Sequence, residues 1–151
     1  MNSLIDINKE PNWKRESIFD KSGLLCHVVI RGSIFSQLDG RVDISDPGEF
    51  LQLGVISGPK GKAFRPHVHL ERSVHHTNFL AQESWVVIKG EVEATFYDQA
   101  GLFICKKELG QGDSSVSFRG GHGYRLLRDS LIYEYKTGPY LGQAQDKRFI
   151  D

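Results

Sequence analysis

Two histidines separated by a single residue are the first chemical signal in the sequence. His67 and His69 flank Val68 in a segment that has an extended character. Side chains alternate between the two faces of an extended strand, so both imidazoles point to the same side. Glu83 opens the next strand-like segment and adds a carboxylate. Imidazole and carboxylate donors on neighbouring strands form the mixed nitrogen and oxygen site that divalent transition metals accept.

The spacing of these residues resembles the first sequence motif of the cupin superfamily, whose members fold as double-stranded β-helices. Gly61 precedes the histidine pair by five residues, and Gly90 follows Glu83 after six. The motif usually has a much shorter gap before its glutamate, whereas residues 70–82 fill that gap here. Glu71 lies closer but lacks a glycine at the right distance. The resemblance therefore assigns the glutamate role to Glu83 and makes residues 70–82 an inserted loop.

A second motif of the same superfamily is matched by residues 112–122, GDSSVSFRGGH. Gly112 and Gly120 have the expected separation, but Phe118 stands where the motif has proline. His122 comes one residue early, and a one-residue slip in a strand turns a side chain to the opposite face. A glycine-rich backbone can absorb such a shift in a turn or bulge, so we keep His122 as the fourth ligand.

Turn signals between short alternating segments indicate an all-β fold. The chain has 151 residues and 16 glycines, which fits one domain of many short strands. Residues 91–97 alternate apolar with polar side chains and lead into a hairpin turn at residues 98–101. Together with the motifs, this predicts a double-stranded β-helix, or jelly-roll barrel, over residues 23–151. Residues 1–22 carry apolar side chains without a clear period, and we expect them to form an extended N-terminal arm that packs across a second copy of the chain.

Charge and hydropathy argue against two classes of partner. Lys plus Arg and Asp plus Glu both number 19, so the chain lacks the basic excess of a nucleic-acid-binding protein. The N-terminus has no basic start followed by an apolar core, and no apolar run approaches the length of a membrane helix. We expect a cytoplasmic protein with no nucleic-acid or membrane partner, and a homodimer by the habit of the superfamily.

The C-terminal part sharpens the resemblance. The runs GGHGY (120–124), LIYEYKTGPY (131–140) and DKRF (146–149) are similar to small single-domain cupins encoded among surface-polysaccharide or nucleotide-sugar genes. Many of those proteins are described as sugar epimerases. The resemblance implies a metal-dependent cupin that isomerises or epimerises a sugar or nucleotide-sugar in polysaccharide biosynthesis. It also implies one divalent ion, Zn, Fe, Mn or Ni.

Isomerase chemistry at such a centre also needs groups that move protons and bind the substrate. Tyr124 and Tyr97 are the candidates for proton transfer, provided that their pKa is lowered, while His75 and His76 qualify only if the inserted loop folds inward. Three arginines flank the ligand-bearing segments and can pair with a phosphate or carboxylate: Arg65, Arg119 and Arg125. Three alternatives stay open. The same ligands can hold Fe(II) in a dioxygenase, the barrel can bind a metal or a sugar without turnover, or the barrel can be a metal-free structural protein.

Overall fold

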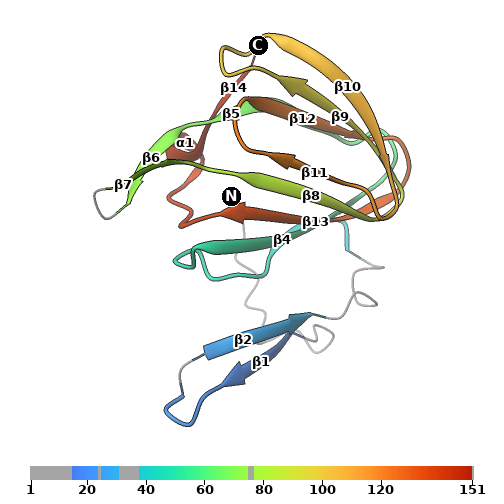
Figure 1. Cartoon of the computed structure of the whole chain (residues 1–151). Coiled ribbons are helices and arrows are strands. Elements are labelled where there is room, and N and C mark those ends of the chain that lie inside the picture. Colours follow the sequence, from blue (N-terminus) through green and yellow to red (C-terminus); the bar gives the residue numbers. More distant parts are fainter. Residues whose placement is uncertain (1–14, 24, 31–37, 75–76, 151) are drawn as a thin grey trace. The chain divides into compact units, whose positions relative to one another are not determined.

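The structure of the protein is a computed structural model, and most of its described residues lie in β-strands (Figure 1). It describes four stretches of the chain: residues 15–23, 25–30, 38–74 and 77–150. The chain divides into two compact units, Met1–Leu38 and Asp39–Asp151. In the first unit, strand β1 (Arg15–Phe19) pairs antiparallel with β2 (Leu25–Ile30). The boundary predicted after residue 22 falls between these two paired strands.

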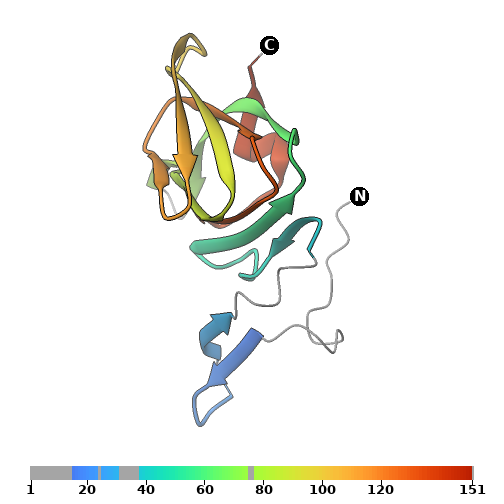
Figure 2. The ribbon, with the colours of Figure 1, turned by 90° about the vertical axis from the view of Figure 1, so that its right-hand side faces the viewer.

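The second unit is built from two antiparallel sheets of five strands each, seen from two directions in Figures 1 and 2. The first sheet has the order β10-β9-β12-β5-β14, with β5 (Ala63–His69), β9 (Glu91–Tyr97), β10 (Phe103–Gly110), β12 (Gly121–Leu126) and β14 (Lys147–Phe149). The second has the order β11-β8-β13-β4-β3, with β3 (Gly40–Asp43), β4 (Leu51–Gly58), β8 (Glu83–Lys89), β11 (Ser114–Ser117) and β13 (Ser130–Thr137). This architecture confirms the predicted jelly-roll barrel.

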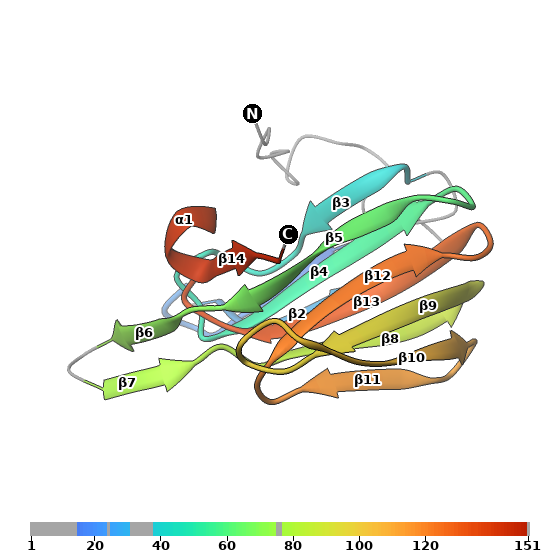
Figure 3. The same ribbon diagram turned by 90° about the horizontal axis from the view of Figure 1, so that it is seen from above.

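Two elements of this unit differ from the prediction. The segment expected to be an inserted loop is a hairpin of β6 (Glu71–Val74) and β7 (Thr77–Leu80), which extends beyond the barrel in Figure 3. Its few β-branched and aromatic residues are compatible with paired strands but do not by themselves distinguish a hairpin from a loop. His75 and His76 lie outside the described residues. A short helix, α1 (Gln143–Asp146), precedes β14, and the described stretches contain no helix long and apolar enough to cross a membrane.

The interior of the barrel is apolar at one end and polar at the other. The apolar end is a cluster of buried side chains: Ile56, Trp85, Val87, Val92, Ala94, Tyr124, Leu126 and Ile132. At the polar end, three strands each carry a buried ionisable side chain: Glu83 on β8, His122 on β12 and Lys136 on β13. Burying polar groups is unfavourable unless they find partners. Their concentration at one end therefore marks a site rather than a variation of the core.

Candidate metal centre

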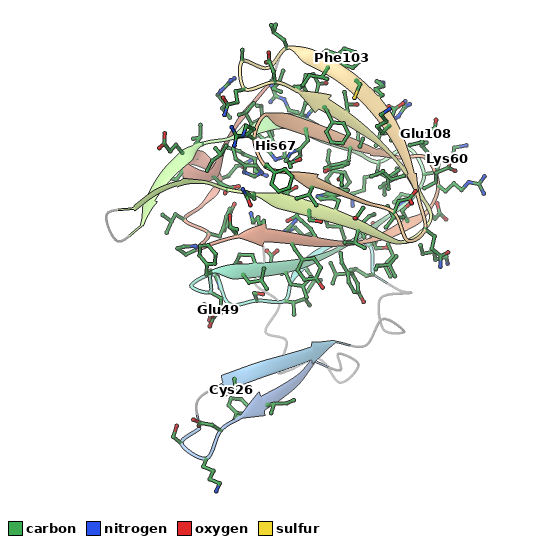
Figure 4. The ribbon with its side chains drawn as sticks, in the orientation of Figure 1. Cys26, Glu49, Lys60, His67, Phe103 and Glu108 are labelled. Carbon is green, nitrogen blue, oxygen red and sulfur yellow. The ribbon has the colours of Figure 1, made fainter. Side chains whose placement is uncertain are left out.

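The four predicted ligands lie together at the polar end of the barrel. His67 and His69 come from β5, Glu83 from β8 and His122 from β12, so both sheets contribute. One donor atom from each residue can be chosen so that all four lie within 4.8 Å of one another. All four side chains are buried, and His122 is completely inaccessible. Figure 4 shows His67 among the side chains that fill the space between the sheets.

Strand register explains how His122 joins the cluster despite its displaced position in the sequence. His122 is the direct partner of His67 in the β12–β5 pair. Directly opposed residues of antiparallel strands point to the same face of the sheet. The register then shifts between His122 and Tyr124, as expected for a bulge that absorbs a one-residue offset. A Cβ at Gly123 would lie 2.9 Å from Cγ of Pro66, so the irregularity needs glycine there.

Glu83 is the hub of the cluster. Its Oε2 lies 3.1 Å from Nε2 of His69, and its Oε1 lies 3.1 Å from Nε2 of His122. The indole N–H of Trp85 donates to Glu83 Oε1 at 2.9 Å and to Oε2 of Glu134 at 3.2 Å. Burial alone would raise the pKa of Glu83, but the adjacent His122 and His69 hold it well below its usual range. Glu83 is therefore an anion at neutral pH, as a metal ligand must be.

Contacts behind the ligands orient two of the three imidazole rings. Nδ1 of His67 lies 3.1 Å from the carbonyl oxygen of Arg65 and donates to it, which leaves the lone pair on Nε2. Nδ1 of His69 lies 3.4 Å from Oδ2 of Asp146, within ion-pair distance. Such outer contacts fix the ring and tautomer of a metal-binding histidine. In the described part of the chain, Nδ1 of His69 and Nδ1 of His122 are both buried without a hydrogen bond, but only that of His69 has a carboxylate within ion-pair distance, so the ring of His122 is the least constrained.

The two histidines of β5 have opposite electrostatic environments. Burial, reinforced by the positive charge of Lys147, lowers the pKa of His67 to about 3. Burial also disfavours charge on His69, but its contacts with Asp146 and Glu83 outweigh burial and raise its pKa to about 9. At neutral pH the metal-free protein therefore holds His67 neutral and His69 protonated. A metal ion that binds here takes the place of the proton on His69.

Two residues of the C-terminal segment reach the cluster, and neither was predicted as a site residue. Asp146 is completely buried, and its Oδ2 lies 3.6 Å from Nζ of Lys136 and 3.9 Å from Nζ of Lys147. Nζ of Lys147 also lies 3.3 Å from Nε2 of His67, a residue 80 positions away in the sequence. No spacing rule reveals such a contact, because it is made through the pairing of β14 with β5.

An open cavity of about 370 Å³ is lined by cross-strand neighbours of the cluster, although none of the four candidate ligands is among its lining residues. Its lining residues come from β9 to β12 and the turn after β11: Phe96, Tyr97, Ile104, Val116, Ser117, Phe118, Arg119 and Gly121. Phe96 is the direct cross-strand partner of His122, and Ser117 is that of Glu83. Residues beside two of the ligands therefore line the cavity, and its volume lies in the range of small-molecule sites.

The two tyrosines predicted to transfer protons occupy different environments. Tyr124 belongs to the apolar core, stacks on Trp85 with ring centroids 3.8 Å apart, and shares a 2.9 Å hydrogen bond with Oγ of Ser115. Burial, followed by the charge of Glu83, raises the pKa of Tyr124, so the phenol stays protonated at neutral pH. Tyr97 lines the cavity. The role of both residues in proton transfer stays a prediction.

The three predicted arginines lie in different environments. Arg119 lines the cavity, and no ion pair joins it to another residue of the described stretches. Arg125 pairs with Glu93 at 3.3 Å on the surface. The guanidinium of Arg65 lies over the ring of Phe149, 4.6 Å from its centroid. Of the three, Arg119 is therefore the one placed to meet a ligand in the cavity.

The donor set fits a divalent transition metal. Nε2 of both His69 and His122 faces a Glu83 oxygen, and Nε2 of His67 carries a lone pair. Three imidazoles and one carboxylate are ligands that Zn, Fe, Mn and Ni all accept. The cluster thus has the donor chemistry of a divalent metal centre.

No family model matches the chain, and no curated protein sequence matches it. The chain does, however, resemble several solved structures. An uncharacterized conserved protein with a double-stranded β-helix domain from Klebsiella pneumoniae is 17% identical with a TM-score of 0.51, covering 77% of this chain and 87% of that one. The cupin domain of Cnp3 from Schizosaccharomyces pombe is 12% identical with a TM-score of 0.54, covering 85% and 88%. CapF, solved with the inhibitor 3-isopropenyl-tropolone, is 15% identical with a TM-score of 0.60, covering 81% of this chain but 37% of that one.

Proposed function

We propose that this chain, which has the double-stranded β-helix fold of the cupin superfamily, is a metal-dependent isomerase or epimerase of a small sugar or nucleotide-sugar. The proposal rests on one observation, the buried group of His67, His69, Glu83 and His122, two of whose cross-strand partners line a cavity of small-molecule size. A metal-free structural barrel would have no need to bury four such groups with their donor atoms facing one another. Polysaccharide biosynthesis, a cytoplasmic location and a homodimer belong to the same proposal.

Glu83 and His67 have different roles in holding the ion. Glu83 supplies the negative charge and is kept in place by the indole N–H of Trp85. His67 is held neutral by burial and by Lys147, so its Nε2 is available without loss of a proton. The bound ion supplies Lewis acidity that polarises a substrate carbonyl. That chemistry suits removal of a proton from the neighbouring carbon, which is the common step of isomerisation and epimerisation.

The cavity supplies the substrate contacts in this proposal. The ring of Tyr97 offers an apolar face to a sugar ring and a hydroxyl for hydrogen bonding or proton transfer. Arg119, at the same cavity, can pair with a phosphate or carboxylate of the substrate. Tyr124 lies in the buried core and stays protonated beside Glu83, so its proposed role is to donate a hydrogen bond rather than to act as a base.

Metal analysis of protein purified without an affinity tag tests the proposal. Wild type should carry about one equivalent of a divalent metal, and His67→Ala/His69→Ala should carry none while keeping its β-sheet circular dichroism. Lys60→Ala is a control, because Lys60 lies at the other end of the barrel from His67 (Figure 4). Wild type that neither carries nor takes up Zn, Fe, Mn or Ni would overturn the metal centre.

Activity separates the remaining candidates. An isomerase or epimerase should incorporate solvent deuterium into a nucleotide-sugar in D₂O, as followed by NMR, and the histidine variant should not. Iron in the protein together with oxygen consumption on incubation with small organic substrates would favour the Fe(II) dioxygenase, which the same donor set permits. A bound metal without turnover of any sugar or nucleotide-sugar would leave a metal-binding or sugar-binding module.

A further inference from the structure

Two side chains of the C-terminal run 146–149 touch the candidate ligand histidines, and the function proposed above uses only the effect of Lys147 on the charge of His67. We propose that Asp146 and Lys147 make this segment part of the metal centre. Asp146 is a positioning residue that fixes the ring of His69, and Lys147 is a cation that holds an anionic group of the bound substrate beside the metal. This inference rests on the proposed metal site, and its test separates the failure of one from the failure of the other.

The backbone holds Asp146 against the strand that carries the histidines. Lys147, the next residue, is the direct partner of His69 in the β14–β5 pair. The carbonyl oxygen of Asp146 accepts a 2.8 Å hydrogen bond from the amide of Leu70, immediately after β5. The pairing of Lys147 with His69 and the hydrogen bond from Leu70 hold Asp146 in place. The Asp146 carboxylate has no exposed surface and is directed at the ring of His69.

The Asp146 carboxylate acts on His69 through the ring nitrogen that faces away from Glu83. Oδ2 of Asp146 lies 3.4 Å from Nδ1, while Nε2 of the same ring lies 3.1 Å from Glu83 Oε2. A carboxylate at Nδ1 keeps the proton on that nitrogen and leaves Nε2 for the metal. Lys136 offsets the buried charge, since its Nζ lies 3.6 Å from Asp146 Oδ2 and 4.2 Å from the ring centroid of Tyr140.

Lys147, unlike Asp146, should oppose the binding of a metal ion. Its Nζ lies 3.3 Å from Nε2 of His67, the nitrogen that carries the lone pair because Nδ1 donates to Arg65. An ammonium at this position repels a divalent cation and attracts an anion that binds beside it. The side chain is 20% exposed, so it lies at the edge of the cluster rather than within the closed core. The two neighbouring residues should therefore change metal binding in opposite directions.

Cobalt(II) titration followed by visible absorption tests Asp146. Asp146→Asn should weaken Co²⁺ binding by about 10- to 100-fold, the usual effect of changing an outer partner of a metal-binding histidine. Glu108→Gln removes one negative charge from an exposed position at the far end of the barrel and should bind Co²⁺ like wild type (Figure 4). Equal Co²⁺ affinity of Asp146→Asn and Glu108→Gln would overturn the positioning role.

Azide binding to the Co²⁺-loaded protein tests Lys147. Lys147→Met should bind Co²⁺ at least as tightly as wild type, yet bind azide about tenfold more weakly because a charge-assisted contact is lost. Imidazole, a neutral ligand, should bind both proteins equally, and Lys107→Met, which changes an exposed lysine, should leave both ligands unaffected. Unchanged azide binding, or an equal loss of azide and imidazole, would overturn the role of Lys147.

One measurement on the unmodified chain guards against variants that fail to fold. In the Zn²⁺-loaded wild type, ¹⁵N NMR should find the proton of the His69 ring on Nδ1. A proton on Nε2 would overturn the positioning of His69 by Asp146. Failure of wild type to take up either Co²⁺ or Zn²⁺ would overturn the metal centre itself, and with it this inference.

Discussion

His122 lies directly opposite His67 in the β12–β5 pair, and the centroids of their rings are 4.6 Å apart. Of the two rings, only that of His67 is oriented by a hydrogen bond at Nδ1. Nδ1 of His67 donates to the carbonyl of Arg65, whereas Nδ1 of His122 has no hydrogen-bond partner within the described stretches. Orientation of a ligand ring before binding lowers the entropy lost when the metal binds.

This difference predicts unequal losses when the two ligands are removed. His67→Gln and His122→Gln should each weaken Zn²⁺ binding by at least about tenfold, with the larger loss for His67. Isothermal titration of both variants, at a pH where wild type binds one equivalent, measures the two affinities. Wild-type affinity in His122→Gln would show that this residue does not reach the metal.

The opposite pKa shifts of the β5 histidines predict a stability maximum for the metal-free protein near pH 6.5, the ordinary pKa of histidine. Because the pKa of His69 is raised to about 9, its contribution is complete below pH 6.5 and is lost as the pH rises through 9. Because the pKa of His67 is lowered to about 3, the unfolded chain takes up a proton first, and stability falls as the pH drops from 6.5 towards 3.

Urea unfolding at several pH values, with a chelator present, measures this profile. His67→Phe should flatten the acid side and leave the alkaline side, whereas His69→Gln should flatten the alkaline side. The lowered pKa values of Glu83 and Asp146 add a further loss of stability at acid pH, so the acid side does not become completely flat. A metal-free wild type whose stability does not change between pH 6.5 and 9 would contradict the prediction for His69.

The four candidate ligands could be grouped from the sequence by strand alternation together with the resemblance to the two cupin motifs. Alternation along one strand places His67 and His69 on one face, and the position of Glu83 at the start of the next barrel strand brings its carboxylate to the same end. His122 was a candidate only through the resemblance to the second motif, and the glycines around it allow the register shift that the structure contains.

Other features could not be predicted, since they depend on pairing between distant segments. The contacts of Asp146 and Lys147 with the histidines require β14 to pair with β5 across most of the chain. The segment 71–80 has no period that separates a loop from a short hairpin, and its strands are only four residues each. His67 is neutral and His69 is protonated at neutral pH because of burial and of side chains that lie far away in the sequence.

Trp85 links two buried carboxylates through one N–H group, which predicts a stability cost specific to that donor. Trp85→Phe should keep an aromatic contact with Tyr124 but leave Glu83 and Glu134 without the indole hydrogen, at a cost of about 2 kcal/mol. Glu134 keeps its ion pair with Arg41, at 2.7 Å, so Glu83 should be the carboxylate more strongly affected.

A double-mutant cycle in urea unfolding apportions this cost. If the shared N–H is responsible, Glu134→Gln should change stability by different amounts in the wild-type and Trp85→Phe backgrounds, because both residues belong to one network. Phe64→Leu, which alters another ring that contacts Trp85 at a centroid distance of 5.0 Å, controls for loss of aromatic packing. Strict additivity of Trp85→Phe and Glu134→Gln would contradict the proposed link.

The two glycines that frame the first motif predict different tolerance to alanine. Both have left-handed backbone, with φ of +91° at Gly61 and +93° at Gly90. A Cβ at Gly61 would meet nothing within 4 Å, whereas at Gly90 it would lie 2.6 Å from the carbonyl oxygen of Asp129. Gly61→Ala should therefore cost only the left-handed conformation, about 1 to 2 kcal/mol. Gly90→Ala should cost more, about 3 to 4 kcal/mol, because backbone must also move.

Urea unfolding of the two variants separates conformational strain from steric crowding at these positions. Since the backbone angle is nearly the same at both glycines, the difference between the two losses reports the close approach of β8 and β13 at the end of the barrel. Equal losses would mean that the left-handed angle alone requires glycine at residue 90. A larger loss for Gly90→Ala would mean that the motif glycine after Glu83 is also needed to let the neighbouring chain pass where β8 pairs with β13.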